Sequence, residues 1–269
     1  MVTYESVTIY TITMKDIELN PLDKNQRKLL QFGVVLMLCV FLLGYFIFVT
    51  KKNTTVYLEN QNLHVFDESM TFAYPDRLSM HYPYLLVVKP EKQMTLIYNL
   101  EQKKKEKEIN EIVLDYQNKK LLYVKDASTF IDEQDLGVLC EKGVIKSEKE
   151  ILCVVKVDPN SMQNKLISID VKSNKRKDLY ISKNLITDLN VVDGKYYLGE
   201  IGIEDQKSYL VIDSKQMPVP NIVSMIYQMN GKPYFASFKS ALNKEKEAYF
   251  EINGTSIIEQ KDSKVILYK

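Results

Sequence analysis

The hydrophobic residues of this chain follow two different patterns, which divide it into a short N-terminal part and a long C-terminal part. Residues Leu29 to Val49 form an apolar run, LLQFGVVLMLCVFLLGYFIFV, in which Gln31 is the one strongly polar side chain. From residue 50 onward the apolar runs are shorter and are separated by polar turns. The first pattern predicts one long helix, and the second predicts a series of β-strands.

The run Leu29–Val49 has the length of a transmembrane helix. Its 21 residues, at about 1.5 Å each, span roughly 30 Å, the hydrocarbon thickness of a bilayer. A buried helix of a soluble protein rarely runs this long without a polar face. The flank Val49–Lys52 lacks the small residues of a signal-peptide cleavage site. We therefore predict an uncleaved, single-span anchor that contacts the lipid bilayer from Leu29 to Val49.

Basic residues on either side of this run predict its orientation. Cytoplasmic flanks of membrane helices carry an excess of Lys and Arg. Four such residues precede the run, and two follow it before Arg77. The balance predicts a cytoplasmic N-terminus and an extracytoplasmic C-terminal domain at the plasma membrane. The residues compared are Lys15, Lys24, Arg27 and Lys28 on the N-terminal side and Lys51 and Lys52 on the other.

Residues 1–28 form a short head of mixed polarity. The segment Val2–Met14 is rich in β-branched residues and alternates in part, which favours a strand. Because a lone strand is unstable in water, the head is either disordered or pairs with the sheet edge of a partner.

A short apolar strand that ends in Asp or Asn recurs through residues 50–269. Its six copies end at intervals of 39, 33, 38, 43 and 40 residues. A terminal Asp or Asn can bond the nearby backbone and so start a turn. The copies are VYLEN ending at Asn60, TLIYN at Asn99, STFID at Asp132, LISID at Asp170, YLVID at Asp213 and YFEIN at Asn253.

The segments before most copies of this motif have the form strand, tight turn, strand, as in LNVVDGKYYLGEIGI with its turn at Asp193-Gly194. A weaker strand follows each copy, so the repeat is about four strands long, the size of a propeller blade. The final strand, Lys264–Tyr268, can complete the blade that begins at Val56, which would close the ring. We predict an all-β domain, a six-bladed β-propeller; a β-sandwich or a ring of five or seven blades are the alternatives.

With this repeat, residues 53–269 resemble the divergent bacterial six-bladed propellers of the TolB-like kind. The resemblance is carried by the loose pattern Tyr/Leu-x-x-Ile-Asp/Asn and the turn residues, and the chain has no Trp and therefore no Trp-Asp dipeptide. It implies a ring with a central pocket and an interaction face, and it transfers no functional residue to this chain.

The three cysteines are too few for a disulfide framework. Cys39 lies within the predicted membrane span. Cys140 and Cys153 stand inside apolar runs, so we expect them to be buried as small apolar residues. If the domain faces an oxidising compartment, the alternative is a disulfide between them.

The sequence assigns no catalytic, cofactor-binding or metal-binding residue. A net charge of +1 argues against nucleic acid as a partner. His64 and His81 are the two histidines, and we expect both to be structural or at the surface. No P-loop, GxGxxG, GxSxG or EF-hand pattern occurs. A pair of glycosidase carboxylates distant in sequence stays open, although we expect no enzyme activity.

A basic cluster and two sequons complete the candidates. Lys103, Lys104, Lys105 and Lys107 alternate with Glu residues, which predicts a solvated outer strand rather than a contact with an anionic polymer. Asn53 and Asn253 begin triplets of the glycosylation type, a pattern that arises often by chance.

Three functions fit this organisation. The first is a membrane-anchored protein-binding or scaffold module of the cell envelope. The second is a transmembrane sensor, whose propeller binds an envelope ligand while residues 1–28 contact a cytoplasmic regulator. The third is an envelope hydrolase, which requires paired carboxylates along the central channel.

Overall fold

The computed structural model describes residues 33–41, 54–73, 75–158, 163–238 and 247–269. The chain separates into two compact units, residues 1–52 and 53–269. In the first unit residues 33–41 form an α-helix, with side chains such as Val34 and Phe41 exposed. The rest of the predicted span Leu29–Val49, and the whole head 1–28, lie outside the described residues. No described helical segment combines the length and apolarity that crossing a bilayer requires.

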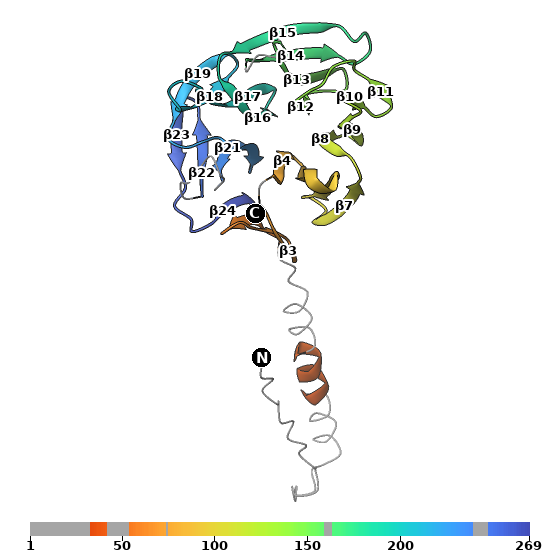
Figure 1. The fold of residues 1–269 in the computed structure, drawn as a ribbon. Helices are drawn as coiled ribbons and strands as arrows, with labels where there is room; N and C mark the ends of the chain where they lie inside the picture. The colour runs from red at the N-terminus through yellow and green to blue at the C-terminus, as the bar shows by residue number, and fades with distance from the viewer. Residues whose placement is uncertain (1–32, 42–53, 74, 159–162, 239–246) are drawn as a thin grey trace, which may run out of the picture. The chain divides into compact units, whose positions relative to one another are not determined.

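The second unit is a ring of six antiparallel sheets, each of four strands (Figure 1), which confirms the predicted six-bladed β-propeller. We number the blades along the chain and give the strands of each from the first to the fourth. Blade 1 is β24 (Val265–Tyr268), β1 (Val56–Glu59), β2 (Asn62–Val65) and β3 (Glu68–Thr71). Blade 2 is β4 (Arg77–His81), β5 (Tyr84–Lys89), β6 (Met94–Asn99) and β7 (Lys104–Ile109), with the 3-10 helix η1 (Pro90–Lys92) before β6.

The remaining four blades follow in chain order. Blade 3 is β8 (Ile112–Gln117), β9 (Lys120–Lys125), β10 (Ser128–Ile131) and β11 (Gln134–Asp135). Blade 4 is β12 (Lys142–Ile145), β13 (Glu150–Lys156), β14 (Asn164–Asp170) and β15 (Arg176–Ser182). Blade 5 is β16 (Leu185–Val192), β17 (Lys195–Ile201), β18 (Ser208–Ile212) and β19 (Lys215–Val219). Blade 6 is β20 (Met225–Met229), β21 (Lys232–Ser237), β22 (Ala248–Asn253) and β23 (Ser256–Glu259).

Blade 1 joins the two ends of the propeller. The last strand, β24, pairs with β1, with Val56 opposite Tyr268 and Leu58 opposite Val265. This confirms the closure predicted from the C-terminal segment. Val265 and Leu267 are fully buried, so the closing strand is also part of the core.

Antiparallel strands give the ring two distinct faces. Turns between first and second strands, and between third and fourth strands, lie on what we call the lower face. Turns between second and third strands, and the connections between blades, lie on the opposite, upper face. The chain enters at Val56 and leaves at Tyr268, both on the lower face.

Five of the six Asp/Asn motifs occupy equivalent positions, at the lower ends of the third strands. There Asn99 and Asp170 accept hydrogen bonds from the backbone three residues on, at 3.0 and 2.7 Å, as expected for turn initiation. Asp132 and Asp213 accept instead from second-strand amides, at 2.9 and 3.2 Å. Our alignment of the first motif is wrong: VYLEN is the second strand of blade 1, and Asn60 lies in a turn of the upper face.

The hydrophobic core consists of layers between neighbouring sheets. Alternate residues of each strand point to opposite faces of its sheet, so each blade can pack against both neighbours. Separate clusters of buried residues lie between blades 2 and 3, 3 and 4, 4 and 5, and 5 and 6. A larger cluster joins blade 1 to blades 2 and 6.

A side chain bridges the centre of the ring, and the central pocket that the resemblance implied is reduced to a small cavity among the first strands. The first strands lie innermost, and β4 and β20 pack directly against each other. Asn190, on β16, donates from Nδ2 to the carbonyl oxygens of Met80 and Ile226, at 2.5 and 2.6 Å. Since these oxygens belong to β4 and β20, one buried side chain connects blades 2, 5 and 6.

Cys140 and Cys153 form a disulfide with a Cα–Cα distance of 5.4 Å, which is the alternative that the sequence left open. Both residues are buried, as expected. Cys140 lies in the connection before β12 and Cys153 lies in β13. The antiparallel pairing of blade 4 brings them together, because Cys153 stands opposite Gly143, just after that connection.

Replacing both disulfide cysteines with Ala is expected to lower the free energy of unfolding by roughly 2–4 kcal/mol, the usual effect of opening a short disulfide loop. Urea denaturation of the full chain without reductant measures the difference. The wild-type protein in excess reductant serves as the control and should approach the variant. Equal stability of the two proteins without reductant would contradict the prediction.

Candidate functional site

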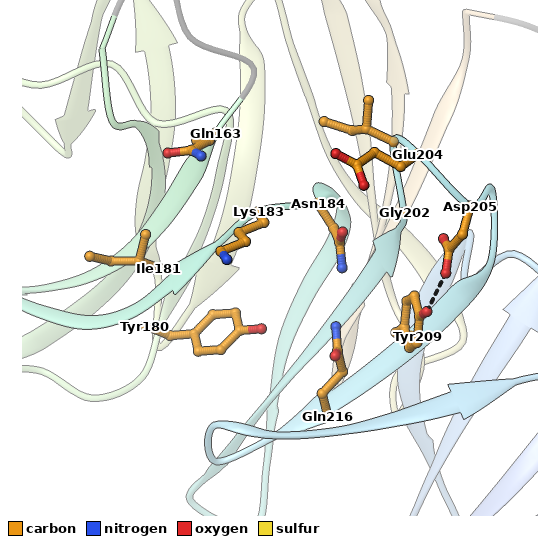
Figure 2. Close-up of a pocket in the computed structure, with 11 residues that line it drawn as sticks. Gln163, Tyr180, Ile181, Lys183, Asn184, Gly202, Glu204, Asp205, Tyr209 and Gln216 are labelled. Carbon is orange, nitrogen blue, oxygen red and sulfur yellow. Dashed lines mark hydrogen bonds between the residues drawn. The ribbon is translucent and has the colours of Figure 1, made fainter.

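A large groove lies on the upper side of blades 4 and 5, between the outer strand β15 and the sheet of blade 5 (Figure 2). Its volume is about 690 Å³. Most of the side chains that line it are polar, and they come from the residue before β14, from β15, from the connection that leads to β16, and from blade 5. They are Gln163, Tyr180, Ile181, Lys183, Asn184, Gly202, Ile203, Glu204, Asp205, Tyr209 and Gln216.

Two tight turns give the groove its shape. Between β15 and β16, Ser182 Oγ accepts from the Asn184 amide at 2.9 Å and donates to the Asn184 carbonyl at 3.1 Å. In the turn after β17, the Gln206 amide donates to the Gly202 carbonyl at 3.0 Å. A Cβ at Gly202 would stand 2.0 Å from Asp205 Oδ1. A larger residue at this position would therefore displace the Asp205 carboxylate from its present place in the turn.

Beneath the groove lies a fully buried carboxylate, that of Glu200 on β17. Its Oε2 accepts from Asn184 Nδ2 at 3.1 Å and from Gln216 Nε2 at 2.8 Å. In Figure 2 these two amides and the Tyr180 hydroxyl point toward a common region between them. Burial, followed by the nearby charge of Glu200, raises the pKa of Tyr180 to about 12, so its hydroxyl stays protonated at neutral pH.

Two further carboxylates lie at the rim, Glu204 and Asp205. The Tyr209 hydroxyl donates to Asp205 Oδ2 at 2.6 Å, and the Lys207 amide donates to Oδ1 at 3.0 Å. These hydrogen bonds, that from Tyr209 first, lower the pKa of Asp205 below its ordinary value. Asp205 is therefore ionised at neutral pH, and Lys183 is the one basic residue among those that line the groove.

Exposed aliphatic side chains gather around the same groove. Ile181 and Ile203 line it and are 59% and 46% exposed. Leu185 begins β16 and Val157 follows β13, both at the upper side of blades 4 and 5, and both are also exposed. The groove thus has both acidic and exposed aliphatic side chains along its rim.

A second, small cavity of about 40 Å³ lies near the ring centre, among the first strands of blades 2 to 5. Asp188, on β16, is buried there and accepts from the Ile226 amide at 2.6 Å. Burial raises the pKa of Asp188 to about 6, although the charge of Lys142 opposes the shift. Burial also lowers the pKa of Lys142.

The raised pKa of Asp188 predicts a pH dependence of stability. Between about pH 4 and pH 6 the native state keeps a proton that the unfolded chain has lost. The contribution of Asp188 to the free energy of unfolding is therefore fully present below about pH 4. It falls by roughly 2–3 kcal/mol as the pH rises to about 6 and beyond. Denaturation of the wild type and Asp188→Asn across this range should show the wild type losing stability relative to the variant. A constant difference would contradict the assignment.

Asp115 and Asp188 have the same structural role in different blades. Asp115 Oδ2 accepts from the Ile145 amide of blade 4 at 2.6 Å, just as Asp188 accepts from blade 6. Each Asp follows a register shift between its own first and second strands. This irregularity directs the carboxylate at the next blade. Both buried acids therefore bind one blade to its neighbour.

The structure shows where the histidines and the lysine cluster singled out in the sequence lie. His81 Nδ1 lies 2.9 Å from Asp115 Oδ2, and His64 stacks on Tyr57 at 4.4 Å between ring centroids. The two histidines are thus structural, as expected. Lys104, Lys105 and Lys107 fall on β7, the exposed outer strand of blade 2, and Lys103 lies in the turn before it, which confirms that prediction. Among the described residues no group of three His, Cys, Asp or Glu is placed to hold a metal ion.

Sequence reasoning missed Glu200, Asp115 and Asp188. Each is a single acid within an otherwise apolar strand, in LGEI, VLDY and ITDL respectively. A charged residue is rarely buried without a specific partner. An isolated carboxylate inside a strand was therefore a signal that could have identified these three positions.

No protein-family model matches this chain, and no curated protein matches it. Three solved structures illustrate its structural similarity. The nidogen/laminin complex structure has a TM-score of 0.49 at 7% identity, covering 79% of this chain and 95% of that chain. The tricorn protease gives 0.43 at 10%, covering 76% of this chain and 25% of the protease chain. A β-propeller domain from Myceliophteria thermophila gives 0.43 at 8%, covering 70% of each chain.

Similarities this low carry no argument about function. The identification of the fold rests on the strand order of the six sheets and on the closure of the ring by β24. Residues 54–269 are a divergent six-bladed β-propeller.

Proposed function

We propose that this chain is a membrane-anchored β-propeller that binds another protein and acts as a scaffold on the extracytoplasmic side of the plasma membrane. The observation that supports protein binding is the group of exposed aliphatic side chains around the groove of blades 4 and 5. Single exposed apolar residues are common on protein surfaces, but a group of them beside a groove is typical of an interaction site. The groove lies on the upper face, opposite the point where the chain enters the ring at Val56.

The anchoring part of the proposal is supported by the length and apolarity of Leu29–Val49. The excess of Lys and Arg before this run supports a cytoplasmic N-terminus. The Cys140–Cys153 disulfide supports an oxidising environment for the propeller, since such bonds persist mainly outside the cytosol.

A non-catalytic role is part of the proposal. The hydrolase alternative needs two carboxylates available to a substrate near the ring centre. Asp115 and Asp188, the buried acids of the first strands, already accept hydrogen bonds from neighbouring blades. This favours a structural use of both groups.

Site-specific photo-crosslinking in intact cells tests the binding face. A photoreactive residue at Ile203 is expected to give a discrete crosslinked species. Ile258, on the outer strand β23 of blade 6, is the matched control, since both side chains are 46% exposed. Crosslinking of equal strength at the two positions, or at neither, would contradict the proposed docking face.

Protease treatment of intact and lysed cells tests the compartment. Digestion of residues 53–269 in intact cells is expected if the propeller lies outside the plasma membrane. A cytoplasmic protein of the same cells, protected until lysis, is the control. Protection of the propeller until lysis would refute the extracytoplasmic assignment. It would not affect the binding face, which the crosslinking experiment tests.

A further inference from the structure

The Glu200 carboxylate has no cationic partner among the described residues. Its Oε2 is held by two neutral amides, and the Tyr180 hydroxyl is a further hydrogen-bonding neighbour of the carboxylate, although Oε1 accepts no hydrogen bond of ordinary geometry from the described residues. None of the ion pairs formed by the described residues includes Glu200. A carboxylate buried without a counter-charge is destabilising by several kcal/mol in proteins.

The surroundings of Glu200 favour a cation rather than an anion. Glu204 and Asp205 add two carboxylates at the rim, against the single base Lys183. Tyr180 and Tyr209 place aromatic rings along the groove, and ring faces attract Lys and Arg side chains. An anionic ligand would meet a net negative charge here.

The rim also fits a side chain that has an apolar stem. Ile181 and Ile203 line the groove and are exposed. Lys and Arg side chains cover apolar surface with their methylene groups while the charged end reaches a polar site. A basic side chain would therefore contact the aliphatic and the acidic residues of the groove together.

We propose that this groove receives a Lys or Arg side chain from an extended segment of the partner protein, with Glu200 as the buried counter-charge. This inference rests on the proposed function, because it identifies the chemistry by which the docking face recognises its partner. Because Glu200 is fully buried and is not among the residues that line the groove, the cationic group in the complex lies next to the Tyr180 hydroxyl and attracts the carboxylate from there, while Asn184 and Gln216 continue to hold Oε2.

Methyl NMR of the full chain in lipid nanodiscs tests this proposal. The probe is a nine-residue peptide with one central Lys flanked by Val residues, and its control carries norleucine in place of Lys. We expect the Lys peptide to shift the methyl signals of Ile181 and Ile203 but not that of Ile258, with at least tenfold weaker binding of the norleucine peptide. Equal binding of the two peptides, or no shift at Ile181 and Ile203, would overturn the proposal.

Two variants test whether peptide binding depends on Glu200 itself or on negative charge in general. Glu200→Gln keeps the side-chain shape and is expected to weaken binding of the Lys peptide at least tenfold, whereas Glu259→Gln on blade 6 should have no effect. If Glu200→Gln does not fold, the double variant Glu204→Gln, Asp205→Asn is used at the exposed rim, with an expected loss of about threefold at low salt. Unchanged binding in the folded variant that is tested would overturn the proposal.

The outcome also separates this inference from the proposed function. Crosslinking at Ile203 together with no preference for the Lys peptide would leave the docking face in place and refute the basic side chain. No crosslinking at Ile203 together with no preference for the Lys peptide would refute both the docking face and the basic side chain.

Discussion

A chain that ends at Ser263 is expected to lose the folded propeller. The truncation removes β24, the first strand of blade 1, and leaves the edge of β1 unpaired. Val265, Ile266 and Leu267 are nearly or fully buried. At about 1.5–3 kcal/mol for each buried aliphatic side chain, their loss removes roughly 5–9 kcal/mol. That amount is comparable with the whole stability of a typical domain.

Thermal unfolding followed by circular dichroism measures this effect in the full chain and the truncated chain. Removal of Lys269 alone is the matched control, because this residue is exposed and lies outside β24. The control should melt like the full chain, whereas the chain ending at Ser263 should show no cooperative transition. A cooperative melt within a few degrees of the control would show that ring closure contributes little to stability.

Replacing Asp115 with Ala is expected to destabilise the propeller by roughly 3–5 kcal/mol. Asp115 is 1% exposed, and its carboxylate joins three blades through His81 of blade 2 and the Ile145 amide of blade 4. Ala would leave this amide and the His81 ring nitrogen without their acceptor in a buried region. Breaking a buried charged interaction by removing one partner is among the most destabilising single substitutions.

Urea denaturation of Asp115→Ala at neutral pH provides the measurement. Glu133→Ala, an exposed carboxylate in a turn of the same blade, controls for the loss of one negative charge and should change stability by less than about 0.5 kcal/mol. Asp115→Asn retains an acceptor oxygen and should lose less stability than Asp115→Ala. If Asp115→Ala is as stable as Glu133→Ala, Asp115 does not bind the blades together.

Much of the architecture was predictable because a propeller blade is built from local features. The turns Asp193-Gly194 and Asn230-Gly231 both have positive φ at their two central residues, the geometry that tight hairpins require. Alternating strands that follow such turns pair with their sequence neighbours. Consequently, local signals were enough to predict the number of blades and the closing strand.

The same approach failed where equivalent short sequences occupy different strands. VYLEN matches the other five motifs in composition and spacing, yet it is a second strand, and Asn60 turns on the upper face. An apolar strand followed by Asn is compatible with either turn of a blade. Which turn it makes depends on β24, more than 200 residues away in the sequence.

The sequence by itself therefore determined the blade number and the hairpin turns, because these follow from side-chain periodicity and turn chemistry within some 40 residues. Tertiary structure decided the rest. The Cys140–Cys153 pairing depends on strand register in blade 4, and the blade contacts of Asp115 depend on which amide the next blade presents. The position of Glu200 beneath the groove likewise depends on two amides, one from the connection between β15 and β16 and one from β19. A hydrogen bond needs its partner within about 3 Å, and the packing of the blades sets that distance.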